Sequence, residues 1–234
     1  MALKYYFDLM SQPSRAVYIF LKANNIKFEA KPVALRKGEN FKEEFTKLNP
    51  WQRVPVLDDN GFVLTESVAI LRYLTSKYNL PEHWYPKNDL QRQARIEEYL
   101  HWQHLNTRMQ AAMVFRQKLI MPVARQGKID EAKVNRFKDQ LPKIIDQLDK
   151  YFLKDGKYIG GNEDISVADL LGVCELTQLY PVFEEEIYMN NKNVKQWMER
   201  VRERLNPHFD DGHSITYRTR EAYKTLGPKL GAKL

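Results

Sequence analysis

Cysteine is almost absent from this sequence, because Cys174 is the only one among 234 residues. An intrachain disulfide is therefore excluded, and the composition favours a reducing compartment, so we expect a cytoplasmic protein. Long apolar runs are absent too. No window offers the roughly 18 apolar residues of a membrane helix, and the opening letters MALKYY lack the apolar core of a signal peptide. We therefore expect no membrane partner.

Neither sign of charge dominates any part of the chain. There are 37 Lys and Arg against 30 Asp and Glu, a net charge of +7, and the signs alternate along predicted helices, as in Arg92, Arg95, Glu97 and Glu98. Such a pattern is typical of a solvated helix surface with i,i+4 pairs. We expect no nucleic-acid partner, because that function needs a concentrated basic patch. The length and the 43% hydrophobic content indicate a globular chain of one large or two small domains.

The stretch NPWQRVPVLDDNGFVLTESVAILRY, residues 49–73, predicts a strand over 53–57, a turn over 58–61, a strand over 62–64 and then a helix. Pro55 cannot donate a ladder hydrogen bond, and it forces Val54 into an extended conformation. The backbone of Val54 is therefore suited to pair with an extended, peptide-like ligand. Ser67 lies at the helix start, where free N–H groups attract a carboxylate. The alternatives are an ordinary edge strand and an ordinary helix cap.

Ahead of this stretch, alternating apolar residues predict a strand over 3–9 with Tyr5, Phe7 and Leu9 on one face. A turn over 10–13 opens a helix at Pro13. A strand over 28–35 and a short helix over 41–48 follow. The order β-α-β-α-β-β-α is that of a thioredoxin-like domain. No cysteine lies in the turn over 10–13, which excludes the thiol–disulfide chemistry that such a fold otherwise suggests.

The rest of the chain reads as helices. We expect a first domain over 1–82, a stiff linker over 83–88 and an all-helical domain over 89–234, beginning with a long helix over 89–119. Pro142 should interrupt the next helical run near Gln140. Another amphipathic helix should end at Asn206 and Pro207. The basic tail over 209–234 is weakly periodic, which leaves two alternatives, disorder or a lid over the active site.

Residues 162–176 carry the sharpest local signal of the second half. Ser166 and Asp169 have capping-box spacing, and Ile165 with Leu170 can form a hydrophobic staple. The helix that follows is apolar around most of its circumference, which predicts burial. Cys174 falls within it, so we interpret this cysteine as an inert core residue.

Two stretches together resemble a known family. Residues 49–73 are similar to the glutathione-binding half of the glutathione S-transferases, and YYFDLMSQPSRAVYIF resembles the theta class in particular. The match runs without a gap over residues 1–86 and more loosely to about residue 205. It implies a thioredoxin-like N-terminal domain, an all-helical C-terminal domain and a homodimer. It also implies a cis peptide bond before Pro55, pairing of the Val54 backbone with the cysteinyl unit, and a γ-glutamyl site at Glu66 and Ser67.

The resemblance implies a glutathione transferase, in which Ser11 stands at the catalytic serine. Its hydroxyl would hold the thiol of glutathione as a thiolate for attack on a small electrophilic substrate, so that glutathione is the co-substrate and no prosthetic group is needed. Haloalkane dehalogenation and hydroperoxide reduction are side activities in some members. The alternative is that Ser11 is a turn residue whose hydroxyl bonds nearby backbone N–H groups. Tyr6 stands where other classes have a catalytic tyrosine, and we interpret it as structural.

Further ligand contacts follow from the same resemblance. They are Gln12, Asn40, Arg53 and Arg108 for glutathione, and Met113 for the electrophile pocket. Asn40 departs from the histidine of many theta members, and Arg108 has a solvated helix position as its alternative.

Two other functions are compatible with parts of the sequence. Glu97, His101 and His104 share one helical face at a spacing that a metal could use, but a solvated or hydrogen-bonded face is the favoured interpretation, so we predict no metal. The alternative to an enzyme is a non-catalytic glutathione-fold protein, acting as a ligand carrier or interaction module, because fold alone does not fix function.

Overall fold

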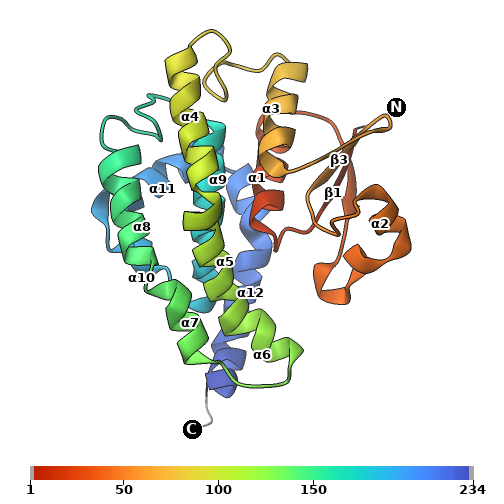
Figure 1. Cartoon of the computed structure of the whole chain (residues 1–234), viewed down its shortest axis with the longest axis vertical. Helices are drawn as coiled ribbons and strands as arrows, with labels where there is room; N and C mark the ends of the chain where they lie inside the picture. The colour runs from red at the N-terminus through yellow and green to blue at the C-terminus, as the bar shows by residue number, and fades with distance from the viewer. Residues whose placement is uncertain (1–2, 232–234) are drawn as a thin grey trace.

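The computed structural model describes residues 3–231, and a four-stranded mixed sheet with helices forms its first part (Figure 1). The sheet order is β2-β1-β3-β4; β1 and β2 are parallel, whereas β3 is antiparallel to both β1 and β4. The elements in chain order are β1 (Lys4–Phe7), α1 (Gln12–Ala23), β2 (Glu29–Pro32), η1 (Leu35–Lys37), η2 (Glu39–Phe41), α2 (Glu43–Leu48), β3 (Val56–Asp59), β4 (Phe62–Thr65) and α3 (Ser67–Lys77). The predicted thioredoxin-like order is confirmed.

Local sequence chemistry explains most of these boundaries. Tyr5 and Phe7 are buried on one face of β1, as their alternation predicts. Asn60 and Gly61 adopt the positive φ angles, 56° and 96°, that the hairpin between β3 and β4 requires. The second strand is shorter than predicted, because the chain leaves the sheet at Pro32 and enters two short 3₁₀ turns around Gly38, whose φ is 70°.

The named elements of the second part of the chain are all helices or helical turns. Its elements are α4 (Leu90–Trp102), η3 (His104–Arg108), α5 (Met109–Phe115), η4 (Arg116–Ile120), α6 (Met121–Ala124), α7 (Glu131–Lys138), α8 (Leu141–Gln147), η5 (Leu148–Phe152), α9 (Val167–Leu176), η6 (Thr177–Val182), α10 (Glu186–Met189), α11 (Lys192–Leu205) and α12 (His208–Gly231). Among residues 3–231, no helix combines the length and the apolar character needed to cross a bilayer.

Pro142 and Pro122 have different effects on these helices. Pro142 lies in the first turn of α8, and the run is interrupted between Lys138 and Leu141, as predicted. Pro122 does not end the long first helix, which continues through wide π-helical turns to Ala124 rather than stopping at residue 119. The π-helical turn directly before α6 changes the regular i to i−4 bonding there, which allows a proline that cannot donate such a bond.

Helix α9 is the centre of the second part, and all ten of its residues are buried. The predicted capping box is confirmed, because Ser166 N–H donates to Asp169 Oδ2 at 2.9 Å while Ser166 Oγ accepts a bond from Ala168 N–H. Asp169 also accepts bonds from Ile159 N–H and from the Trp197 indole N–H. The carboxyl group of Asp169 therefore joins the helix start to the preceding loop and to α11.

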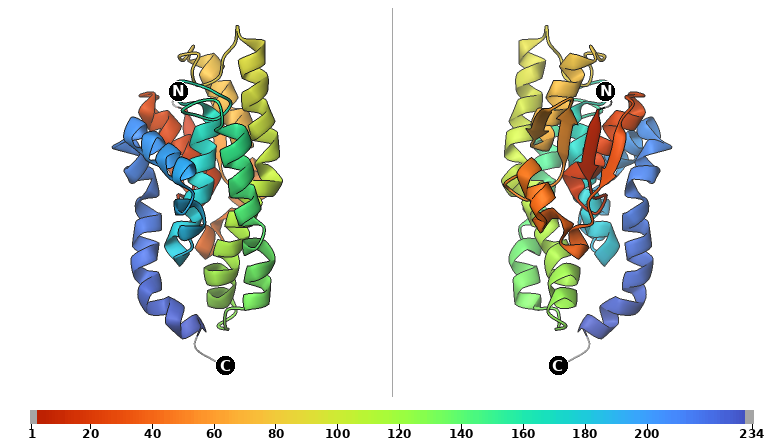
Figure 2. Two further views of the ribbon diagram at one scale, coloured as in Figure 1. Left: turned by 90° about the vertical axis from the view of Figure 1, so that its left-hand side faces the viewer. Right: turned by 90° about the vertical axis from the view of Figure 1, so that its right-hand side faces the viewer.

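The alternative of a disordered tail is wrong for residues 209–231. Helix α12 runs along α1 and η6 as one 24-residue helix (Figure 2). The guanidinium of Arg220 lies over the rings of Tyr180 and Phe183, at 4.1 and 3.8 Å from their centroids. Tyr223 packs in an apolar cluster that includes Met10, next to Ser11. Residues 232–234 of the predicted tail lie outside the described part.

Candidate active site

The end of β1, the start of β3 and the end of β4 lie at the same edge of the sheet, and this brings the predicted site residues together. The pairing of Tyr6 with Val56 places the end of β1 beside the start of β3, and the pairing of Val56 with Thr65 places the end of β4 there as well. The turn that leads to Ser11, the segment around Val54 and the start of α3 at Ser67 are the continuations of these strands. The sheet register therefore collects residues that lie far apart in the sequence.

Within residues 3–231, the hydroxyl of Ser11 makes no hydrogen bond. Ser11 is the N-cap of α1 in an extended conformation (φ −80°, ψ 122°), but its side chain accepts no capping bond. Its backbone N–H donates to the Asp8 carbonyl at 2.9 Å, and the side chain of Asp8 accepts bonds from Met10 N–H and Leu35 N–H. The alternative in which the hydroxyl bonds neighbouring backbone N–H groups is contradicted. A half-buried hydroxyl group on a fixed turn is left for a ligand.

Arg15 holds this turn in place, and the sequence reasoning missed it. Its fully buried guanidinium donates to the carbonyls of Leu9 at 2.9 Å and Met10 at 3.2 Å, and to the Cys174 carbonyl of α9 at 2.9 Å. Burial lowers its pKa to about 10, so Arg15 stays charged at neutral pH. One arginine within the mostly apolar stretch of residues 13–21 was the available signal.

Val54 presents free backbone groups at this edge. The Val54–Pro55 peptide bond is cis, as the resemblance implied. No hydrogen bond within the described chain uses the N–H or C=O of Val54. The preceding carbonyls are engaged, because Asn49 Nδ2 donates to the Arg53 carbonyl at 2.7 Å and Asn40 Nδ2 donates to the Gln52 carbonyl at 2.9 Å. Asn40 thus supports the loop from below, while the side chain of Arg53 is exposed.

The start of α3 has the features of an anion site. Glu66 is exposed with φ 67°, a conformation that side chains other than glycine rarely adopt. Ser67 follows at 2% exposure, and within the described residues its Oγ has no hydrogen-bond partner. The first turn of α3 also receives no side-chain cap. A buried unpaired hydroxyl beside free helix N–H groups is the arrangement expected to receive a carboxylate.

The second domain contributes Arg108 and His104. Arg108 Nη1 lies 3.2 Å from His104 Nδ1, and the pKa of His104 is lowered, first by burial and then by Arg108, which keeps the imidazole neutral at physiological pH. Glu66 acts in the opposite direction on the pKa of His104, so the start of α3 and η3 interact electrostatically. Arg108 is half-buried. The predicted contact of Arg108 with glutathione and its alternative, a solvated helix position, both stay predictions.

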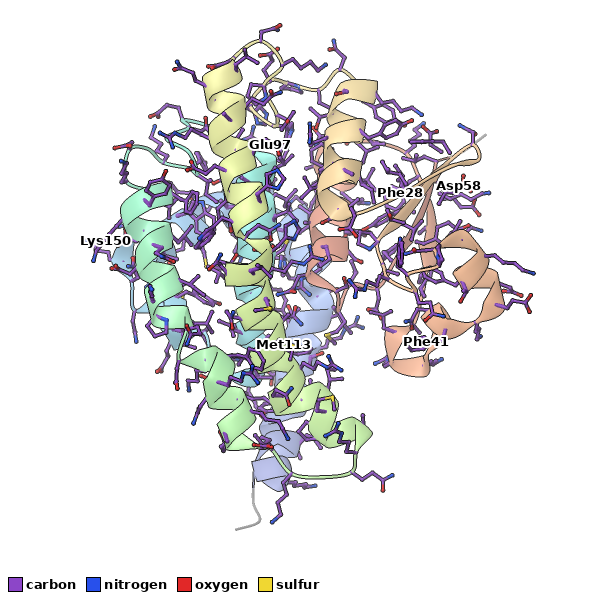
Figure 3. The ribbon with its side chains drawn as sticks, in the orientation of Figure 1. Phe28, Phe41, Asp58, Glu97, Met113 and Lys150 are labelled. Atoms are coloured by element: carbon purple, nitrogen blue, oxygen red, sulfur yellow. The ribbon has the colours of Figure 1, made fainter. Side chains whose placement is uncertain are left out.

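Gln12 and Met113 differ in their environment. Gln12 is buried, and its Nε2 donates to the Glu175 carbonyl at 3.2 Å, so this amide reaches α9. Met113 is half-buried on α5, in the same helical column as Glu97 of α4 (Figure 3). It has no place in the large buried cluster that fills the domain.

Tyr6 packs against the short helix α2. Its ring meets Phe45 edge to face, with centroids 6.4 Å apart, and it contacts an apolar cluster that contains Val54 and Val56. This environment supports the structural interpretation of Tyr6.

The Glu97, His101 and His104 face does not form a metal site. Glu97 accepts a bond from the Tyr85 hydroxyl at 2.6 Å, and His101 lies 3.4 Å from its other oxygen. His104 is turned to Arg108 instead. Nowhere in residues 3–231 do three or more His, Cys, Asp or Glu side chains gather as metal ligands.

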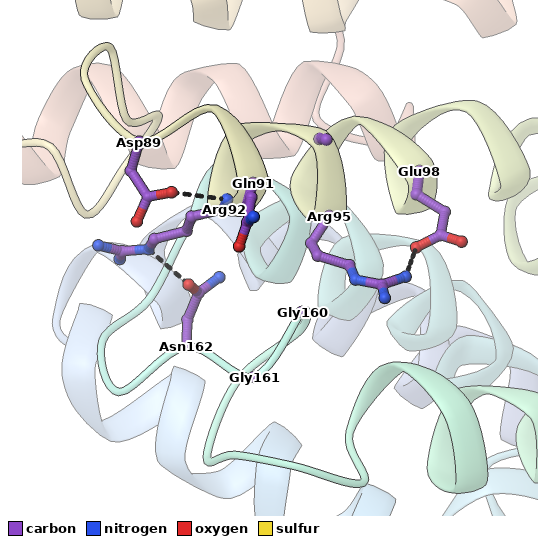
Figure 4. A pocket seen from close by; sticks show the side chains of 9 residues that line it. Asp89, Gln91, Arg92, Arg95, Glu98, Gly160, Gly161 and Asn162 are labelled. Atoms are coloured by element: carbon purple, nitrogen blue, oxygen red, sulfur yellow. Dashed lines mark hydrogen bonds and ion pairs between the residues drawn. The ribbon is translucent and has the colours of Figure 1, made fainter.

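An open hollow between α4 and the loop at residues 160–162 is a different feature (Figure 4). All of its lining residues belong to the second domain, and its charges balance, because Arg92 and Arg95 are matched by Asp89 and Glu98 along α4. The guanidinium groups are engaged, Arg92 with Asn162 and Arg95 with Glu98. This hollow therefore contributes nothing to the site at Ser11.

Comparison with known proteins gives the family. The model of the glutathione S-transferase N-terminal domain matches residues 1–76, and that of the C-terminal domain matches residues 115–206. Glutathione S-transferase theta-3 of Mus musculus is 37% identical, and theta-1 of Homo sapiens is 36% identical; each match covers 100% of this chain and 96% of the relative. A human theta-class glutathione transferase, solved in complex with the glutathione conjugate of 1-menaphthyl sulfate, has a TM-score of 0.90 at 34% identity and covers 99% of this chain and 93% of its own. This chain therefore belongs to the glutathione S-transferase family, and within it to the theta class.

Proposed function

We propose that this chain conjugates the thiol of reduced glutathione to small electrophilic substrates, with Ser11 as the catalytic residue. The observation that carries the proposal is the Ser11 hydroxyl, which bonds nothing inside the described chain and lies at the sheet edge that also presents Val54 and Ser67. The family to which the chain belongs supports the same activity. A non-catalytic carrier would have no use for a hydroxyl held free on a turn that Arg15 fixes.

In this proposal glutathione lies as an added strand along the edge. The cysteinyl unit pairs with the free backbone groups of Val54. The γ-glutamyl carboxylate accepts hydrogen bonds from the N–H groups at the start of α3 and from the Ser67 hydroxyl, and Glu66 faces the γ-glutamyl amino group. Arg108 and Gln12 approach from the domain boundary, and Arg53 lies at the exposed side. Asn40 acts through the loop that it supports, since its amide is bonded to Gln52.

Ser11 then acts on the sulfur. A free thiol has a pKa near 8.5, so roughly a tenth or less is thiolate at neutral pH. A hydrogen bond to a charged group stabilises it by about 1.5–3 kcal/mol, which lowers its pKa by roughly one to two units. One well-placed hydroxyl therefore brings the thiol pKa to about 6.5–7.5, so that the thiolate becomes a substantial fraction at neutral pH. The thiolate attacks the electrophilic carbon, and the leaving group departs with the bonding pair.

The electrophile is proposed to bind between the two domains, with Met113 on one side and the cluster around Met10 and Tyr223 on the other. Haloalkanes and organic hydroperoxides are further substrates to test. The reaction requires no metal and no prosthetic group, because the thiolate supplies the electron pair. We also propose a cytoplasmic homodimer; the exposed apolar side chains of Leu105 and Met109, one helical turn apart, offer contact area.

The test is a conjugation assay with a panel of halides, activated alkenes and hydroperoxides, run on the wild-type chain and on Ser11→Ala. We expect glutathione-dependent product from at least one electrophile and a large loss in the variant. Glutathione binding without turnover of any electrophile would support the carrier instead. A crystal structure with glutathione in which the sulfur lies beyond hydrogen-bond reach of Ser11 Oγ would overturn the mechanism.

A further inference from the structure

Glu175 is a buried carboxyl group that the proposed mechanism does not use. It lies on α9 at 1% exposure. Its Oε2 accepts a bond from Thr107 Oγ1 at 2.6 Å, while its Oε1 has no partner among the described residues. A buried carboxylate with one hydrogen bond is costly, because its charge is poorly solvated. Such a group in the centre of a domain therefore calls for a functional explanation.

Glu175 connects the two halves of the site. On one side, its backbone carbonyl accepts the bond from Gln12 Nε2, next to Ser11. On the other side, its carboxyl group meets η3, where Thr107 is followed directly by Arg108. Among the residues that the structure describes, the guanidinium of Arg108 has no carboxylate within ion-pair distance, and its recorded bond is to neutral His104. Its positive charge is therefore available to a ligand.

The titratable groups that act on Glu175 or lie next to it come from several elements. The Tyr99 hydroxyl reaches it from α4, because Gly172 leaves room: a Cβ there would lie 2.6 Å from the Tyr99 oxygen. On α9 itself, the Cys174 thiol is neutral, its pKa raised to about 12 by burial, and Asp169 is committed to the capping box. Arg15 on α1 acts on Cys174. Arg108 is thus the cation that the carboxyl group of Glu175 feels most directly.

The electrostatics place the change of charge within an accessible pH range. Burial raises the pKa of Glu175 to about 8, against the opposing effects of Thr107 and Arg108. At neutral pH the carboxyl group is therefore mostly protonated, and above about pH 8 it becomes an anion that interacts electrostatically with Arg108.

We propose that Glu175 is a positioning residue that controls Arg108. As a neutral acid it leaves the positive charge of Arg108 to bound glutathione, and as an anion it draws that charge toward itself. The proposal rests on the glutathione-binding part of the proposed function. It makes glutathione affinity fall at alkaline pH through a group that touches neither the tripeptide nor the electrophile.

The test is the dissociation constant of glutathione, measured by titration calorimetry from about pH 6.5 to about pH 9.5. For the wild-type chain we expect the Kd to rise by roughly three- to tenfold more than for Glu175→Gln, whose side chain stays neutral throughout. Ionisation of free glutathione affects both proteins equally and cancels in the comparison. Glu98→Gln, the same change on the outer face of α4, is the matched control and should follow the wild-type profile.

Two further variants separate positioning from structural damage. In an Arg108→Ala background the substitution at Glu175 should lose its pH-dependent effect, because the charge that it controls is gone. If Glu175→Gln fails to fold, Thr107→Val serves instead: it removes the bond that favours the anion, so the rise in Kd should move to higher pH.

Parallel Kd profiles for the wild type and Glu175→Gln would overturn the inference, as would a pH-dependent difference that persists without Arg108. The proposed function fails separately, through the absence of conjugation by the wild-type chain. If the wild type and Glu175→Gln differed in their Kd profiles but the wild type conjugated no electrophile, the role of Glu175 would stand and the proposed enzymatic function would fail.

Discussion

Replacing Ser11 by alanine should damage the chemistry while sparing the fold. A serine-to-alanine change at an N-cap usually costs about 1 kcal/mol, because a capping bond is lost. Ser11 makes no such bond, so most of that penalty should be absent and the Tm should be nearly unchanged. The hydrogen bond to the thiolate is lost instead, and its free energy of about 1.5–3 kcal/mol corresponds to a rise of roughly one to two units in the thiol pKa.

The assay has two readouts. At neutral pH we expect kcat/KM to fall by roughly ten- to a hundredfold, and the loss should narrow as the pH rises above the pKa of the free thiol. The pKa of bound glutathione, followed by the ultraviolet absorbance of the thiolate, should rise by the same amount. Ser14→Ala is the matched control, because Ser14 lies on the same helix with a buried hydroxyl that has no partner in the described chain.

Tyr6→Phe supplies the result that would refute this reasoning. Tyr6 packs against Phe45, and we expect its variant to keep most of its activity. If Tyr6→Phe lost more activity than Ser11→Ala, or if the thiol pKa stayed the same without Ser11, the assignment of the catalytic hydroxyl would be wrong.

Three further predictions follow from single contacts. Ser67→Ala should weaken glutathione binding roughly tenfold or more, a loss of about 1.5–3 kcal/mol, with little change in Tm, because its Oγ has no partner within residues 3–231; unchanged affinity in calorimetry would contradict the carboxylate site. Arg220→Ala should lower the Tm by about 2–8 °C, a loss of about 1–2 kcal/mol, because α12 loses its contacts with Tyr180, Phe183 and Glu185. Arg220→Lys should restore part of the lost Tm, and an equal Tm in the wild type and both variants would show that these contacts do not stabilise α12. His213 is fully buried, and burial lowers its pKa to about 3. Near pH 5 the unfolded chain therefore binds a proton that the folded chain does not, so the free energy of unfolding should be about 2 kcal/mol lower than above about pH 6.5. Urea unfolding at both pH values should show a smaller difference for His213→Gln than for the wild type.

Local rules were enough for several elements because their causes lie within a few residues. The turn at Asn60 and Gly61 needs positive φ angles, and these two residue types tolerate them. Ser166 and Asp169 satisfy each other's backbone groups across three positions, so their spacing alone predicts the cap. Pro142 removes a donor wherever the chain goes, and the helix breaks before it. The family resemblance added the placement of Ser11, Val54 and Ser67, which propensity alone leaves open.

Local sequence patterns were sufficient to predict the order of strands and helices in the N-terminal domain and the residue types that the site presents. Tertiary structure decided the partners: Arg15 with the carbonyls of two domains, Gln12 with Glu175, and Arg220 between the rings of Tyr180 and Phe183. The tail became a helix because α1 and η6 cover one side of it, although its own periodicity is weak. The physical reason is the sequence separation between the residues that interact. Caps and turns are fixed by neighbours along the chain, whereas burial and charge depend on what long-range packing brings next to each group.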